Sequence, residues 1–169
     1  NARGVAGFNS MNDGRYYSAQ DKFENIIKYA FADGNVVDTI LRKTDVNING
    51  FSYSFSDNEQ KILLQTNFKQ IYRHSFAASI YVFDLASKKL TQPITEQVML
   101  AEFSPDGNKL AYVKNNNLFV FDLSTNKETQ ITTDGKTNSI INGATDWVYE
   151  EEFALSKGFY WNKNGTQLA

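Results

Sequence analysis

The stretch that decides the fold is AEFSPDGNKLAYV, at residues 101–113. Hydrophobic and polar residues alternate on both sides of a turn centred on Asp106 and Gly107. An Asp-Gly pair tolerates the positive φ angle that tight hairpin turns require, and alternation with a period of two is typical of half-buried strands. The stretch therefore predicts a β-hairpin.

The same pattern occurs four times along the chain. Its other copies are FNSMNDGRYY (8–17), FSYSFSDNEQKILL (51–64) and FYWNKNGTQLA (159–169). Spacings of 44, 49 and 58 residues separate the turn positions Gly14, Asn58, Gly107 and Gly165. Two copies are followed by a second strand-turn-strand pattern, IYVFDLASKKLT (80–91) and LFVFDLSTNKET (118–129). Four strands in a repeat of about 40–50 residues are typical of a β-propeller blade.

We therefore predict an all-β fold, an incomplete β-propeller of about three and a half four-stranded blades. The approximate blades are residues 1–49, 50–97, 98–141 and 142–169, the last incomplete, within one domain at 1–169. A β-sandwich with regular hairpins is the alternative, but it does not require the Phe-Asp-Leu segment to recur at a fixed offset. Propellers typically close with about 4–8 blades, so we expect the sequence to be truncated.

Composition excludes several classes of function. The net charge of −2 gives no basic field for nucleic acid, and the absence of cysteine excludes disulfides and thiolate metal sites. No apolar run approaches the roughly 18 residues of a membrane span. The first residues, Asn1 to Val5, contain no apolar stretch of the signal-peptide type. We expect no metal, no cofactor and no nucleic-acid partner.

An acidic run interrupts the fourth repeat, within TDWVYEEEFALS at residues 145–156. Charge runs usually form solvated faces, but the flanking Trp147, Tyr149 and Phe153 favour a partly packed environment for this one. Two close carboxylates in such a site repel each other, so we expect at least one raised pKa and a preference for a bound ammonium group. An ion pair at about 4 Å contributes roughly 1 kcal/mol in water and about 4 kcal/mol at an effective dielectric near 20.

Two local geometries remain open for this run. In a strand, Glu150 and Glu152 share one face. In a helical turn, successive residues lie about 100° apart, so that Glu151 and Glu152 fan around one point while Glu150 turns away. Asp146 is then placed to cap the turn. Periodicity alone does not choose between the two.

A second interruption, NFKQIYRHS at residues 67–75, carries Arg73 and His74. Arginine has a planar fork of donors that suits a carbonyl or carboxylate, although a local surface salt bridge is the simpler interpretation. His74 is the only histidine, and we interpret it as structural rather than catalytic.

Several of these motifs resemble one known family. DWVYEEE (146–152), followed by YWNKNGT (160–166), closely resembles the signature of dipeptidyl peptidase IV-like serine peptidases of the prolyl oligopeptidase type. YRHS (72–75) and FSPDGNKLAYV (103–113) resemble the same family, in the same order. The resemblance implies an eight-bladed propeller, a C-terminal α/β-hydrolase domain, and release of N-terminal dipeptides with Pro or Ala at the second position.

The resemblance also implies roles for three residues. Glu151 and Glu152 are expected to bind the free α-amino group of the peptide substrate, and Arg73 to contact the carbonyl of the penultimate residue. These roles select the helical turn over the strand. The family further implies a homodimer and an extracytoplasmic location, either periplasmic or membrane-anchored.

No catalytic residue is assigned within the chain. The nearest approach to a Gly-x-Ser-x-Gly nucleophile elbow is GFSYS (50–54), which lacks the final glycine, and a single histidine leaves no plausible Ser-Asp-His triad. We expect the hydrolase domain to be absent, the family's triad to lie beyond Ala169, and this fragment to be inactive alone. The alternatives are a non-catalytic propeller that scaffolds protein contacts, and a relative that releases tripeptides or acylated amino acids.

Overall fold

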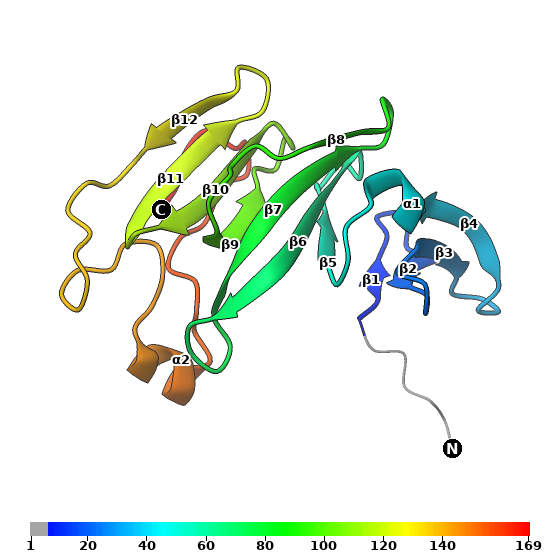
Figure 1. Cartoon of the computed structure of the whole chain (residues 1–169). Helices are drawn as coiled ribbons and strands as arrows, with labels where there is room; N and C mark the ends of the chain where they lie inside the picture. Colours follow the sequence, from blue (N-terminus) through cyan, green and yellow to red (C-terminus); the bar gives the residue numbers. More distant parts are fainter. Residues whose placement is uncertain (1–6) are drawn as a thin grey trace.

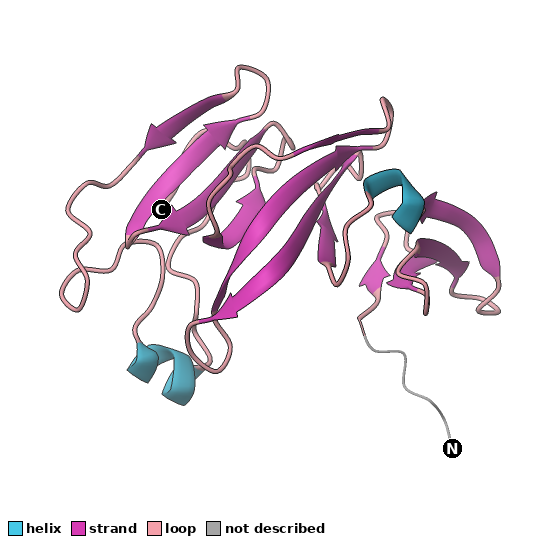
Figure 2. Ribbon diagram, viewed as in Figure 1, coloured by secondary structure: helices cyan, strands magenta, loops and turns pink. Residues whose placement is uncertain are grey.

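The computed structural model describes residues 7–169. The first residues of the predicted first blade, including the stretch Asn1 to Val5, lie outside the described part. The regular structure consists mainly of antiparallel strands, with two short helices, so the all-β fold class is confirmed (Figures 1 and 2). Within residues 7–169, no helix is long and apolar enough to cross a membrane.

The first sheet contains four strands in sequence order, each antiparallel to the next. They are β1 (Asn9–Ser10), β2 (Tyr16–Gln20), β3 (Ile26–Ala30) and β4 (Val36–Leu41). Helix α1 (Lys43–Val46) then leads to the second group of strands. In Figure 1 this first sheet lies at one end of the molecule.

The second sheet combines the next two groups of strands. The second group is β5 (Ser52–Phe55), β6 (Lys61–Gln70), β7 (Phe76–Asp84) and β8 (Lys89–Thr91). The third group is β9 (Val98–Phe103), β10 (Lys109–Lys114), β11 (Asn117–Asp122) and β12 (Lys127–Gln130). Helix α2 (Trp147–Phe153) and a bridge between Trp161 and Leu168 follow.

Strand β7 joins these two groups. Its last residues pair with β8, whereas Ala77 and Ala78 near its start pair with Met99 and Val98 of β9. The sheet order is therefore β12-β11-β10-β9-β7-β6-β5. The β6–β7 hairpin is longer than a blade hairpin needs to be, and its extension carries residues 71–75 toward α2 (Figure 1). The exact blade boundaries stay a prediction.

The central strands are buried on both faces, which explains their nearly continuous apolar runs. In β6, Ile62 and Leu64 pack in a core cluster with residues of the first sheet, whereas Leu63 packs on the opposite side with residues of the third group. In β10, Leu110 and Tyr112 face the second group, and Ala111 and Val113 pack in a cluster with Phe159. Alternate side chains of one strand thus enter different cores. This is the packing of sheets stacked face to face along the chain.

The hairpin turns of successive groups also contact each other. Lys61 Nζ donates to the Gly107 carbonyl at 3.0 Å, and Lys109 Nζ donates to the Gly165 carbonyl at 3.1 Å. Gly107 has a φ of +69°, and a Cβ atom there would lie 3.2 Å from Ser56 Cβ. A glycine therefore meets two requirements at this turn, a left-handed backbone and a close approach. The hairpin turn that recurs in the sequence therefore also forms the contact that recurs between successive groups of strands.

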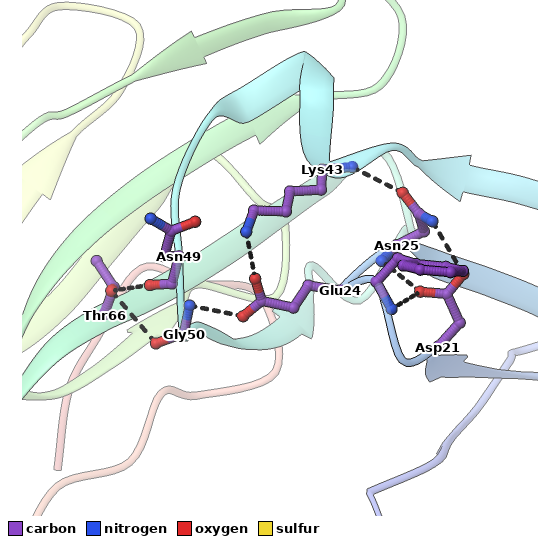
Figure 3. Close-up of polar contacts among 8 residues, drawn as sticks. Asp21, Glu24, Asn25, Lys43, Asn49, Gly50 and Thr66 are labelled. Atoms are coloured by element: carbon purple, nitrogen blue, oxygen red, sulfur yellow. Dashed lines mark hydrogen bonds and ion pairs between the residues drawn. The ribbon is translucent and has the colours of Figure 1, made fainter.

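Glu24 holds the junction between the first sheet and the second (Figure 3). Its carboxylate accepts a hydrogen bond from Lys43 Nζ of α1 and another from the backbone N–H of Gly50, both at 2.6 Å. On the far side of this junction, Thr66 Oγ1 donates to the Asn49 carbonyl at 2.9 Å. The hydrogen bond from Lys43 and that from Gly50 hold the pKa of Glu24 below its ordinary value.

This lowered pKa predicts an acid-sensitive contribution to stability. Because the folded state binds the Glu24 proton less tightly than the unfolded state, the contribution is present at neutral pH and is lost as pH falls through the folded-state pKa. We expect Glu24→Gln to lower the urea midpoint at pH 7, and the difference from the wild type to shrink near pH 3. Urea unfolding at both pH values measures this. An equal deficit at both would contradict it.

Candidate functional site

Helix α2 presents the acidic run, and its first turn is capped as the helical alternative requires. Asp146 has extended backbone angles at the N-cap, and its carboxylate accepts a hydrogen bond from the Tyr149 N–H at 3.0 Å. The helix ends at Ala154, which adopts the left-handed conformation with a φ of 54°. The acidic run is thus helical, and the strand alternative is wrong.

The segment that carries α2 is closed at its base like a hairpin. Ala144 forms a β-bridge with Lys157, and the Thr145 N–H donates to the Ser156 carbonyl at 3.3 Å. Just before this bridge, Gly143 has a φ of +75° and lies against a core cluster. A Cβ atom on Gly143 would lie 2.8 Å from Val113 Cγ2 and 3.1 Å from Leu118 Cδ1. The core therefore fixes the point from which α2 extends.

Glu150 faces the protein interior. It is 1% exposed, and it is the only charged residue among the buried side chains of the described part. Its Oε1 accepts hydrogen bonds from the backbone N–H of His74 at 2.6 Å and of Ser75 at 3.1 Å. Glu150 does turn away from solvent, as the helical alternative requires. The sequence did not predict a role for Glu150, so the contact between the acidic run and residues 74–75 was missed.

The pKa of Glu150 shifts in the direction opposite to the one expected for a buried carboxylate. Burial raises the pKa, but the hydrogen bonds from His74 and Ser75 stabilise the charged form, and the pKa lies below its ordinary value. This lowered pKa concerns Glu150 alone, and the expectation of at least one raised pKa in a close pair of carboxylates stays a prediction. At Glu150 the hydrogen bonds from Ser75 and from the His74 backbone N–H together outweigh the effect of burial on the pKa.

Arg73 and Glu151 form an ion pair at the surface above this buried contact. Arg73 Nε lies 3.2 Å from Glu151 Oε2. The Glu151 side chain is 13% exposed, whereas the Arg73 side chain is 71% exposed. The structure thus brings two of the three predicted site residues, Arg73 and Glu151, into direct contact. The third, Glu152, is the next residue of α2 and is exposed.

The aromatic neighbours of the acidic run do not behave as the sequence suggests. Trp147 is 54% exposed, Tyr149 52% and Phe153 63%. Tyr149 and Phe153 lie against each other, with ring centroids 5.7 Å apart. Part of the run does lie in a packed environment, as expected, because Glu150 is buried and the Glu151 side chain is 13% exposed. The three aromatic side chains that suggested this environment are themselves exposed.

A cavity of about 510 Å³ borders the start of α2. Its walls include Tyr72 beside Arg73, Asn116 at the β10–β11 turn, and Asp146 and Trp147. His74 is exposed, and only its backbone N–H reaches Glu150. Across residues 7–169, no group of three or more His, Cys, Asp or Glu side chains is placed to hold a metal ion.

Comparison with known proteins matches this chain to one family. The family described as "Dipeptidyl peptidase IV (DPP IV) N-terminal region" matches residues 56–169, which is more than half of the chain and includes β6–β7 and α2. The chain belongs to the dipeptidyl peptidase IV N-terminal region family. The resemblance inferred from DWVYEEE and its companion motifs is confirmed.

Individual relatives within the dipeptidyl peptidase IV family agree. The chain is 31% identical to human "Prolyl endopeptidase FAP" over 165 residues, which is 96% of this chain and 22% of that protein. It is 42% identical to pig "Dipeptidyl peptidase 4" over 120 residues, 69% of this chain and 16% of that protein. The crystal structure of Porphyromonas gingivalis dipeptidyl peptidase 4 superposes with a TM-score of 0.89 at 36% identity, covering 99% of this chain and 25% of that one. The chain thus spans about a fifth of the length of these curated relatives and matches part of their propeller region.

Proposed function

We propose that this chain is the substrate-recognition region of a serine exopeptidase that releases N-terminal dipeptides, with Pro or Ala at the second position. In this proposal Glu151 and Glu152 bind the peptide's α-ammonium group, and Arg73 binds the carbonyl of the penultimate residue. A C-terminal α/β-hydrolase domain of the same protein supplies the nucleophile. The parent enzyme is a homodimer located outside the cytoplasm.

The observation that carries the proposal is the ion pair between Arg73 and Glu151 next to the exposed Glu152. Among these three side chains, two carboxylates and one guanidinium leave a net charge of one negative, which matches the single positive charge of a peptide N-terminus. Since the Glu151 side chain is 13% exposed, water screens it less than an ordinary surface carboxylate.

Arg73 has a separate part in this proposal. A guanidinium has five N–H donors, and the contact with Glu151 involves Nε. The donors on the two Nη atoms belong to a side chain that is 71% exposed, and they suit a peptide carbonyl. One residue therefore both orients Glu151 and offers donors to the substrate backbone. An amine held at a fixed distance from the nucleophile admits two residues between them, which accounts for dipeptide release.

Blocking the substrate amine tests the proposal. The α-amino group has a pKa of about 7.7–8.0 and is largely protonated at pH 7, whereas an acetylated amine carries no charge and has lost two of its three donors. We expect N-acetylation of an X-Pro peptide to lower kcat/KM of the full-length parent at least tenfold, because charge-assisted hydrogen bonds contribute about 1.5–3 kcal/mol. Paired assays of free and acetylated peptides measure this.

The opposite result would also be informative, because one relative is named an endopeptidase and the other a dipeptidyl peptidase. An endopeptidase cleaves internal bonds and needs no free amine, so equal cleavage of both peptides would refute the amine anchor and favour endopeptidase activity. Failure to cleave either peptide, with a correctly folded protein, would favour a non-catalytic propeller.

A further inference from the structure

We propose that Glu150, the buried member of the acidic run, is a positioning residue that sets the place of Arg73 relative to Glu151. This inference rests on the proposed function, because it concerns the same site. It assigns to Glu150 no contact with the substrate.

The first support is the place of Glu150 between the two interruptions of the repeat. Residues 71–75 form the turn of the β6–β7 hairpin, and α2 lies 75 residues further along the chain. Between these segments the structure has one surface ion pair, Arg73 with Glu151, and the buried hydrogen bonds of Glu150. Surface pairs contribute only about 0–1 kcal/mol and do not fix geometry by themselves. The buried carboxylate is therefore the stronger connection.

The second support is the way in which the backbone around Arg73 is held. On one side, the Gln70 side chain donates to the Arg73 carbonyl at 3.0 Å. On the other side, the N–H groups of His74 and Ser75 donate to Glu150. Within the turn, the Ile71 N–H donates to the Ser75 carbonyl at 2.9 Å. Of these contacts, only those of Glu150 reach from the turn to α2. Glu150 thus ties the backbone next to Arg73 to the helix that carries Glu151.

The third support is the exposure of Arg73 itself. Its side chain is 71% exposed, so packing does little to restrict its rotamers. An exposed arginine loses roughly 1–2 kcal/mol of side-chain entropy when it is held in one place. Fixing the backbone on which it stands reduces the number of conformations that must be given up on binding, which is pre-organisation of the site.

Two conservative substitutions separate the effect of the Glu150 side-chain length, which sets whether its oxygen reaches both N–H groups, from the effect of its charge. Glu150→Gln keeps the chain length and an oxygen that accepts from both N–H groups, but removes the charge. Glu150→Asp keeps the charge but is one methylene shorter, so that its oxygens no longer reach both donors. A positioning role depends on reach. We expect KM for an X-Pro peptide to rise about fivefold or more in Glu150→Asp with kcat changed less than twofold, and to stay within about threefold of the wild type in Glu150→Gln.

The experiment uses the full-length parent enzyme with three further readouts. Amide hydrogen exchange of residues 71–76 is expected to be faster in Glu150→Asp than in Glu150→Gln, whether or not a substrate is present. In an Arg73→Ala background, Glu150→Asp is expected to add less than about twofold to KM, since its effect acts through Arg73. Val46→Ala, which alters a buried position in α1 away from the site, serves as the control for general destabilisation and is expected to leave KM unchanged.

The outcomes separate this inference from the proposed function. A wild-type KM in Glu150→Asp, an undiminished effect in the Arg73→Ala background, or the same KM increase in Val46→Ala would each overturn the positioning role. Unchanged kcat/KM in both Glu151→Gln and Glu152→Gln would instead overturn the proposed function, and with it the inference. In that case hydrogen exchange would still report the mechanical link from Glu150 to the hairpin turn.

Discussion

Replacing Glu151 by glutamine in the full-length parent enzyme is expected to lower kcat/KM for dipeptide release by about a hundredfold. The substitution keeps the size of the side chain but removes the carboxylate that Arg73 contacts at 3.2 Å. The guanidinium then remains next to the substrate ammonium without its neutralising partner. The substrate ammonium thereby loses its attraction to the Glu151 carboxylate, and it is repelled by the unpaired guanidinium of Arg73.

Glu152→Gln is the matched comparison, with a smaller expected loss of roughly tenfold or more. It removes the same charge from an exposed position and leaves the ion pair of Arg73 with Glu151 intact. Asp38→Asn, an exposed acidic position in β4, controls for net charge and is expected to leave kcat/KM unchanged. Steady-state kinetics on all three variants measure the order of effects. If Glu152→Gln were the more damaging, the assignment of Glu151 as the partner of both Arg73 and substrate would be wrong.

A large loss of stability is expected for Gly143→Ala. An alanine there must adopt a φ of +75° and place its Cβ atom 2.8 Å from Val113 Cγ2. The left-handed backbone costs roughly 1–2 kcal/mol and overpacking a core costs about 1–3 kcal/mol more, so we expect a total loss of about 2–5 kcal/mol. Because Gly143 precedes the base of the α2 segment, the relaxation also displaces the acidic helix.

Gly34→Ala separates the two contributions. Gly34 has a φ of +71°, close to that of Gly143, but no atom lies within 4 Å of the point that a Cβ atom would occupy there. Its variant should therefore show the backbone cost alone, about 1–2 kcal/mol. Urea unfolding of both variants measures the difference, which is expected to be about 1–3 kcal/mol. Equal losses would mean that the core beside Gly143 accommodates a methyl group.

The sequence predicted the parts of the fold that depend on local chemistry. The hairpin at residues 101–113 forms as expected because Gly107 can adopt positive φ and because period-2 alternation suits strands with covered faces. The capping of α2 by Asp146 was likewise foreseeable. Asp146 lies three residues before Tyr149, whose N–H donates to its carboxylate, and this is the usual spacing of an N-cap. The choice between helix and strand for the acidic run needed the family resemblance.

What the sequence could not predict depends on contacts between distant segments. Nothing in the local pattern indicates that the turn after Gln70 reaches Glu150, or that Ala77 and Ala78 pair with the next group of strands. The burial of Glu150 was missed for the same reason. An alternating pattern shows which side chains share a face, but it does not show what covers that face.

The buried tie between α2 and the β6–β7 hairpin limits how this binding surface can be transplanted. A designer who grafts only residues 145–156 onto a foreign scaffold would carry over the carboxylates without Arg73, and would leave the inward-pointing Glu150 facing the donor-free interior of its new host. A desolvated, unpartnered carboxylate is costly and takes up a proton instead. The smallest portable unit is therefore two loops together with the strands that hold them in register.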